Sequence, residues 1–76
     1  MAYNLGIQIR LFRIAKGLSW EKLAELSDLS TKGLNNIELN KSEPKFRTVE
    51  RIVNALNISF DDLVNENHPF IIDLKW

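Results

Sequence analysis

The chain has no cysteine and a single histidine, His68, among its 76 residues. Without cysteine it can form neither a disulfide framework nor a thiolate metal site. A domain of about 8.8 kDa that lacks both depends for its stability on efficient helix packing, on oligomerisation or on both. His68 has no suitably spaced carboxylates to share a metal ion, so we expect no metal site and no cofactor.

Long apolar runs and an excess of one charge are also missing. No apolar run approaches the roughly 18 residues that a membrane span needs, and no Lys- or Arg-led apolar segment is typical of a signal peptide. Ten Lys and Arg balance ten Asp and Glu, which argues against a strongly basic nucleic-acid binder and against a polybasic membrane anchor. With 45% hydrophobic and 26% charged residues, we expect one small globular domain in the cytoplasm that contacts no membrane.

One local pattern, an apolar residue followed by Ser, three further residues and Leu, occurs three times. The copies are residues 18–23, 29–34 and 58–63. Each fits a helix start, because the Ser hydroxyl accepts from an unpaired amide of the first turn and the preceding apolar residue packs on the Leu. Only the third copy has an acid, Asp62, at the position that completes a capping box. The pattern predicts helix starts near Trp20, Thr31 and Phe60.

Hydrophobic periodicity predicts two more helices. A stripe at helical spacing runs from Leu5 to Phe12, with Gly17 as its stop signal, and another runs from Val49 to Leu56. The expected helices cover about residues 4–16, 20–26, 31–38, 46–56 and 60–66. Because the connections between them are short, we predict a compact all-α domain over residues 1–66 and a short extended tail over residues 67–76.

The tail has a different pattern. Phe70, Ile72, Leu74 and Trp76 alternate with other residues at period two, as in a β-strand. A lone strand in an α-domain has no partner of its own. Two interpretations stay open: the tail packs on its own domain, or it pairs with the same segment of a second chain in a homodimer.

The first predicted helix has a second apolar line. Ile7, Leu11 and Ile14 lie nearly opposite the inward-facing stripe of that helix. We expect the tail or a partner subunit to cover this face.

The helices predicted over 20–26 and 31–38 are separated by only four residues, Ser27 to Ser30. Two short helices joined by so tight a turn are typical of a helix-turn-helix. Ala24 is small where the helices would cross, and Asp28 stands where the chain must turn sharply, which requires a positive φ.

A longer register of residues extends around this motif. It consists of Leu5-Gly6, Ile9-Arg10, Arg13, Gly17-Leu18-Ser19, Leu23-Ala24-Glu25, Leu29-Ser30, Leu34, Ile37-Glu38, Asn40, Pro44, Thr48-Val49, Ile52, Ala55-Leu56, Ile58-Ser59 and Leu63. In this register, over about residues 5–64, the chain resembles the phage Cro/repressor (XRE-like) helix-turn-helix family. The resemblance implies a five-helix, lambda-repressor-like domain that binds double-stranded DNA with its third helix in the major groove.

Base-reading residues follow from the resemblance. They are Ser30, Thr31, Lys32 and Asn36. Helical geometry independently turns Lys32, Asn35 and Asn36 away from the inward-facing residues of the same helix. Asn can form two hydrogen bonds with adenine, and Lys can donate to guanine. The alternative interpretation is an ordinary solvated face.

Phosphate contacts are expected from two helix starts and from nearby cations. The residues are Ser19, Trp20, Lys41, Lys45, Arg10 and Arg47. Trp20 departs from the family, which usually has Gln there: either its indole N–H donates to a phosphate or its ring anchors a protein partner. Gly33 costs about 1 kcal/mol relative to Ala in a helix, and either the site tolerates this or the missing side chain lets DNA approach closely.

Arg13 and Glu38 stand where the family has an internal ion pair between the first helix and the end of the third. The resemblance therefore implies a structural pair that holds the recognition helix on the core. Two independent surface charges are the alternative.

The sequence thus predicts a bacterial or phage transcriptional regulator, a repressor, that binds a palindromic operator as a homodimer. No enzyme is expected: Asp61 and Asp62 open a helix, where negative charge is favourable, and no nucleophile–base pair or phosphate-binding loop is present. The alternative is a protein-interaction module, antitoxin-like or anti-repressor, that contacts a partner through Trp20 or the tail.

The zero net charge conceals two oppositely charged parts. Residues 1–51 contain nine Lys and Arg against six acids, a net of +3, and residues 52–76 contain one Lys against four acids, a net of −3. We therefore expect a basic part that faces DNA and an acidic, apolar part that serves assembly.

Overall fold

The structure is a computed structural model that describes residues 5–64, and these form five helices and no strand. The helices are α1 (Leu5–Ala15), α2 (Trp20–Leu26), α3 (Thr31–Glu38), α4 (Phe46–Leu56) and α5 (Phe60–Val64). The predicted all-α fold is confirmed, and α2, α3 and α5 begin at the predicted residues. The predictions for the tail, including its dimerisation residues and the domain boundary at residue 66, lie outside the described residues.

Serine side chains cap three helix starts. Ser19 Oγ and Ser30 Oγ each accept from the backbone amide three residues later, at 3.0 and 2.9 Å. At α5 the bonding is reciprocal, since Ser59 Oγ accepts from the Asp62 amide at 3.0 Å and Asp62 Oδ2 accepts from the Ser59 amide at 3.2 Å. The leucines of the three patterns, Leu23, Leu34 and Leu63, are fully buried. The repeated pattern therefore both starts these helices and anchors them in the core.

The first four helices also end alike. Each is followed by a residue with positive φ: Gly17 (73°), Asp28 (59°), Asn40 (60°) and Asn57 (59°). The amide of the next residue donates to the carbonyl five positions back, at 2.8–3.1 Å, which is the bonding of a Schellman motif. The positive φ predicted at Asp28 is confirmed.

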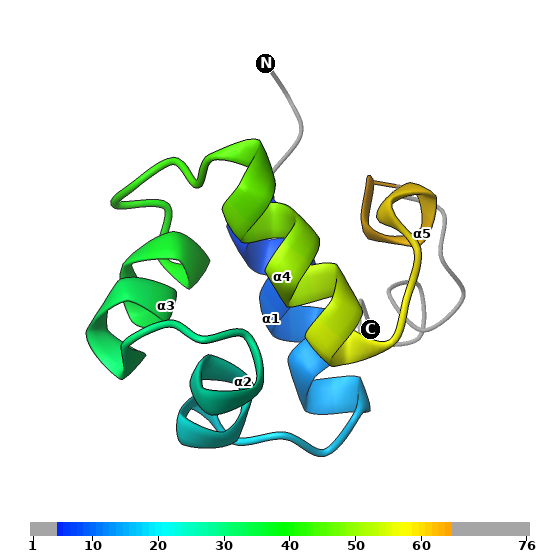
Figure 1. The fold of residues 1–76 in the computed structure, drawn as a ribbon, viewed down its shortest axis with the longest axis horizontal. Coiled ribbons are helices and arrows are strands. Elements are labelled where there is room, and N and C mark those ends of the chain that lie inside the picture. Colours follow the sequence, from blue (N-terminus) through cyan, green and yellow to red (C-terminus); the bar gives the residue numbers. More distant parts are fainter. Residues whose placement is uncertain (1–4, 65–76) are drawn as a thin grey trace, which may run out of the picture.

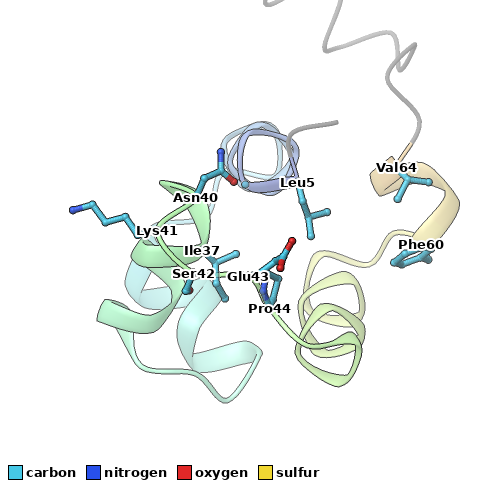
Figure 2. A pocket seen from close by; sticks show the side chains of 10 residues that line it. Leu5, Ile37, Asn40, Lys41, Ser42, Glu43, Pro44, Phe60 and Val64 are labelled. Carbon is cyan, nitrogen blue, oxygen red and sulfur yellow. The ribbon is translucent and has the colours of Figure 1, made fainter. Parts of the chain in front are cut away.

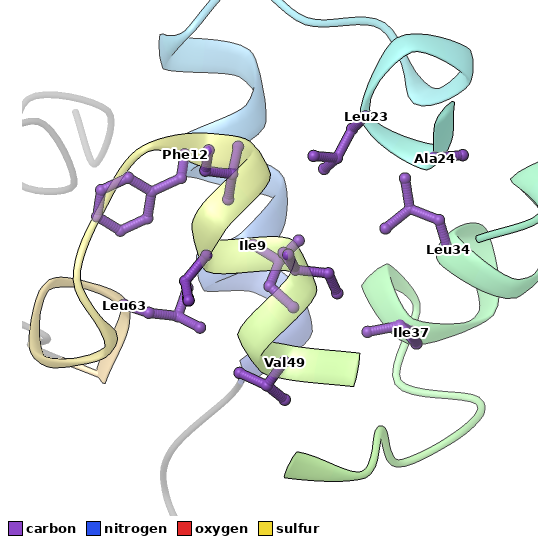
Figure 3. Packing of buried hydrophobic residues seen from close by; sticks show 11 residues of the cluster. Ile9, Phe12, Leu23, Ala24, Leu34, Ile37, Val49 and Leu63 are labelled. Carbon is purple, nitrogen blue, oxygen red and sulfur yellow. The ribbon is translucent and has the colours of Figure 1, made fainter. Parts of the chain in front are cut away.

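The core lies along α1 and α4, which overlap in the view of Figure 1, with α2 and α3 on one side of them and α5 on the other. Figure 3 shows Phe12 and Ile9 of α1, Val49 of α4 and Leu63 of α5 converging on this core. The buried hydrophobic residues are Ile9, Phe12, Leu23, Ala24, Leu34, Ile37, Val49, Ile52, Val53, Leu56 and Leu63. All five helices contribute to this core, and α3 packs on α1 and α2. No helix in residues 5–64 has the length and apolar character needed to cross a membrane.

Candidate nucleic-acid interface

The turn between α2 and α3 is held by local hydrogen bonds. Ser27 is 2% exposed, and its Oγ donates to the Leu23 carbonyl at 2.6 Å. Asp28 takes the left-handed conformation, and the Leu29 amide donates to the Ala24 carbonyl at 2.8 Å. Because Ser30 then caps α3, every residue of the turn has a defined conformation, and α3 leaves α2 at a fixed angle.

The recognition helix α3 has a buried face and an exposed face. Leu34, Ile37 and Glu38 are buried, whereas Thr31 and Lys32 are exposed. Two of the predicted base-reading residues therefore project from the first turn of α3, which is the part of such a helix that enters the major groove.

The other three candidates are placed differently. Ser30 Oγ accepts from the Gly33 amide, which leaves its hydroxyl hydrogen free to donate. Asn36 and Asn35 are both half-buried. Asn35 differs from the prediction, because its Oδ1 is enclosed and has no hydrogen-bond partner among the described residues. The physical reason is its position next to Leu34, about 100° around the helix, at the border between the two faces.

All four predicted phosphate-binding cations are exposed and form no ion pair with another described residue. They are Arg10, Lys41, Lys45 and Arg47. By contrast, the exposed Lys22 and Arg51 lie 3.6 and 4.0 Å from acidic partners. Lys45 is also the N-cap residue of α4 and makes no side-chain bond to the first turn, so the amides there keep their capacity to bind an anion.

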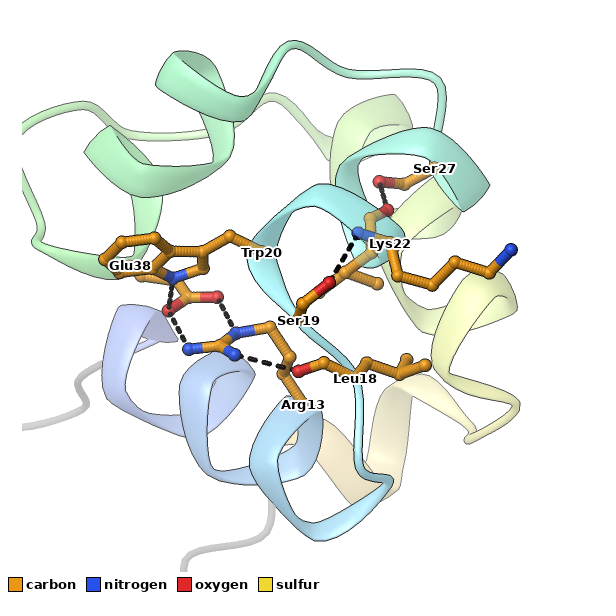
Figure 4. A network of polar contacts seen from close by, with 8 residues as sticks. Arg13, Leu18, Ser19, Trp20, Lys22, Ser27 and Glu38 are labelled. Atoms are coloured by element: carbon orange, nitrogen blue, oxygen red, sulfur yellow. Dashed lines mark hydrogen bonds and ion pairs between the residues drawn. The ribbon is translucent and has the colours of Figure 1, made fainter.

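Arg13 and Glu38 form the predicted ion pair, and it is buried (Figure 4). Arg13 Nε donates to Glu38 Oε2 at 2.8 Å, and Nη2 donates to Oε1 at 3.2 Å. The remaining Nη1 donates to the Leu18 carbonyl at 2.9 Å. The side chains are 10% and 1% exposed. This two-point contact therefore joins α1 to the end of α3, and the alternative of two independent surface charges is wrong.

Trp20 does not fit the predicted phosphate contact. Its Nε1 donates to Glu38 Oε1 at 2.8 Å, and the Arg13 guanidinium lies 5.5 Å from the centre of its ring. An indole has one N–H, so in this structure none is left for a phosphate. Sequence reasoning missed this contact because it joins residues 18 positions apart, which only the fold brings together.

An open pocket of about 580 Å³ lies between the start of α1, the loop from α3 to α4, and α5. Leu5, Pro44, Phe60 and Val64 give it apolar walls, and Figure 2 shows the Glu43 carboxylate among them. No sequence signal indicated this pocket. Within residues 5–64, no three His, Cys, Asp or Glu side chains are grouped so that they could hold a metal ion.

Comparison with known sequences agrees with this geometry. The family model described as helix-turn-helix matches residues 9–63. The chain is 29% identical over 63 residues to the SPbeta prophage-derived uncharacterized HTH-type transcriptional regulator YonR of Bacillus subtilis (strain 168). This match covers 83% of the chain but 58% of the relative, so the chain spans little more than half the length of that protein.

Solved structures show the same arrangement of helices. The restriction-modification controller protein C.AhdI from Aeromonas hydrophila superposes with a TM-score of 0.77 at 31% identity, over 80% of this chain and 92% of that one. The clp gene regulator ClgR from C. glutamicum gives the same TM-score and identity, over 80% of this chain and 79% of that one. The chain therefore belongs to the helix-turn-helix family, in the phage Cro/repressor (XRE-like) form that its sequence register indicated.

Proposed function

We propose that this chain is a transcriptional regulator that binds double-stranded DNA sequence-specifically, with α3 in the major groove and α2 across the backbone. The observation that carries the proposal is the exposed first turn of α3, where Thr31 and Lys32 project from a helix-turn-helix of fixed geometry. Exposed cations at the start of α4 and in the loop before it, which form no ion pair within residues 5–64, supply phosphate contacts. The structural relatives named above are a controller protein and a gene regulator, which supports the assignment.

We further propose that the regulator acts as a homodimeric repressor on a palindromic operator. Two copies related by a two-fold axis would place their α3 helices about 34 Å apart, one DNA turn. Such a protein needs no catalytic group, and we propose no enzymatic activity for it. Its place of action would be the cytoplasm of a bacterial cell, where the DNA lies.

The test of DNA binding is fluorescence anisotropy with labelled duplexes from the DNA upstream of the protein's own gene. A duplex of the same length and composition but shuffled sequence serves as the control. We expect tight binding to one upstream duplex, weak binding to the shuffled one, and a steep loss of affinity with salt. Equal binding to both duplexes at low salt, unchanged in Lys32→Ala and Asn36→Ala, would contradict the proposal.

Sedimentation equilibrium tests the homodimer separately. If the segment with Phe70, Ile72, Leu74 and Trp76 forms the interface, the full chain sediments as a dimer and a chain without residues 69–76 sediments as a monomer. A truncated chain that remains dimeric would exclude this role for the segment.

A second candidate function is a protein-interaction module. On α1, Ile7 and Ile14 are 47% and 49% exposed, and such residues suit an apolar interface. Salt separates the two functions, because a DNA reader with about six phosphate contacts loses affinity steeply as salt rises whereas an apolar interface does not. A partner complex that forms equally well in high salt and excludes the upstream duplex would favour this second function.

A further inference from the structure

We infer that Trp20 is a positioning residue that ties the start of α2 to the end of α3, and so sets the angle at which α3 meets DNA. The inference rests on the function proposed above and deepens it. Trp20 is the first residue of α2 and Glu38 is the last residue of α3. A hydrogen bond of 2.8 Å between their side chains joins the two outer ends of the helix-turn-helix (Figure 4).

Hydrogen bonds therefore hold α2 and α3 together at both ends of the helix-turn-helix. At the inner end, the turn from Ser27 to Ser30 fixes where α3 begins. At the outer end, three N–H groups donate to one carboxylate, two from Arg13 and one from Trp20. Arg13 brings in α1 and the loop before α2 through its bond to the Leu18 carbonyl. Four segments of the chain thus meet at Glu38, and Trp20 is the member that belongs to α2.

The burial of Glu38 keeps the indole N–H where it is. The Glu38 side chain is 1% exposed, so its carboxylate is satisfied by Arg13 and Trp20 and not by bulk water. If Trp20 turned toward a phosphate, a buried carboxylate would lose one of its donors and the Arg13 guanidinium would lose its contact with the ring. We therefore expect the bond between Trp20 and Glu38 to persist in the DNA complex.

A positioning role predicts a particular pattern of binding. Base contacts need α3 at one angle, whereas contacts between flexible cations and phosphates tolerate a change of angle. Loss of the indole N–H should therefore weaken binding to the specific duplex and leave binding to a shuffled duplex, and its salt dependence, nearly unchanged. A direct phosphate contact from Trp20 would instead weaken binding to both duplexes by the same factor.

The first experiment follows the indole N–H by nuclear magnetic resonance in the full chain. Two indole signals are expected, and the one absent from Trp20→Phe belongs to Trp20. We expect this signal to move in Glu38→Gln, to exchange slowly with solvent, and to keep its slow exchange when the upstream duplex is added. A signal that is insensitive to Glu38→Gln would overturn the inference without testing whether the chain binds DNA. Loss of the slow exchange when the duplex is added would overturn it as well.

The second experiment measures affinities of Trp20→Phe, which keeps an aromatic ring and loses the N–H. We expect about a tenfold loss on the specific duplex and less than a twofold loss on the shuffled one. In a Glu38→Gln background the same substitution should cost less than in the wild-type chain, because the amide oxygen of Gln accepts a weaker hydrogen bond from the indole than the carboxylate does. Leu26→Ala, at an exposed site on the same helix, should change neither affinity.

The outcomes separate the inference from the proposed function. If the wild-type chain does not distinguish the two duplexes, the proposed function fails, while the resonance experiment in the free protein still decides whether the bond exists. If the wild-type chain distinguishes them and Trp20→Phe loses affinity equally on both, Trp20 is not a positioning residue. Additive effects of Trp20→Phe and Glu38→Gln would lead to the same conclusion.

Discussion

The backbone of Gly6 in α1 lies directly against the carbonyl oxygen of Glu38 at the end of α3: a Cβ on Gly6 would come within 2.8 Å of that oxygen. The carbonyl oxygen of Ile37 would be nearer still, and Asn40 Oδ1 would lie at 2.7 Å. Backbone atoms of a packed helix cannot move aside singly, so the absence of a side chain at this position lets α1 and α3 approach one another. Gly6 therefore acts on the same end of α3 as the ion pair with Arg13.

Gly6→Ala should destabilise the domain by about 1–3 kcal/mol, because the added methyl group must push α3 away from α1. Urea denaturation measures the loss. Gly33→Ala is the matched control, since the new Cβ would meet only Ser30 Oγ, at 3.0 Å. There the gain in helix propensity and the disturbed cap oppose one another, and we expect a net change within about 1 kcal/mol. Equal losses in the two variants would show that the close approach at Gly6 is not what matters.

At Asn57, the backbone conformation determines whether a substitution raises or lowers the stability of the domain. It ends α4 with φ 59° and ψ 44°, whereas Asn54 lies within the same helix, and both are exposed. Ala is disfavoured in the left-handed region and favoured in a helix. We expect Asn57→Ala to lower the melting temperature and Asn54→Ala to raise it, each by an amount equivalent to about 0.5–1 kcal/mol.

Glycine should reverse these signs, with Asn57→Gly more stable than the wild-type chain and Asn54→Gly less stable. Calorimetry of the four variants provides the complete comparison. If the two alanine variants shift in the same direction, the effect arises from the asparagine side chains and not from the backbone conformation.

Removal of the Glu38 carboxylate should be among the most damaging single changes. Glu38→Ala leaves the Arg13 guanidinium buried without its acid and the Trp20 N–H without an acceptor. The expected loss of unfolding free energy is about 3–5 kcal/mol. Glu25→Ala breaks an ion pair whose side chains are 54% and 73% exposed, and should change stability by less than about 0.5 kcal/mol. Comparable losses in the two variants would contradict the assignment of Glu38 as a buried structural residue.

The elements of this fold that local chemistry determines were predictable from the sequence. Ser19, Ser30 and Ser59 start helices through bonds that span three residues, so the pattern around each contains the whole cause. The left-handed conformation of Asn57 could have been predicted as that of Asp28 was, because an Asn directly after the last periodic residue of a helix is a known stop signal.

The parts of the site that depend on tertiary packing were not predictable in this way. The role of Trp20 follows from where Glu38 lies, and the inward turn of Asn35 Oδ1 follows from how neighbouring helices enclose one side of α3. Helical periodicity gives the direction of a side chain but not what covers it. The ion pair of Arg13 with Glu38 was accessible only because the family resemblance supplied the long-range contact that the residues alone do not encode.

Lys32 and Lys45 should have different effects on DNA binding, although both are exposed lysines. Lys32 lies in the first turn of α3, where a side chain can donate to guanine. Lys45 is the N-cap residue of α4, and its side chain is expected to contact a phosphate. We expect Lys32→Ala to lose about 1–3 kcal/mol of binding free energy on the specific duplex and much less on a shuffled one. Lys45→Ala should weaken binding to both duplexes by a similar factor.

The salt dependence of binding provides the second measurement for this pair. A phosphate contact that is lost lowers the slope of log affinity against log salt by about one, since one fewer counterion is released. Lys45→Ala should show this decrease on both duplexes, and it should persist on the shuffled duplex, where no base is read. Lys32→Ala should keep the wild-type slope on the shuffled duplex. If both variants lower the affinity and the salt slope by the same proportion on both duplexes, Lys32 contacts a phosphate. Base recognition must then be assigned to other residues of α3.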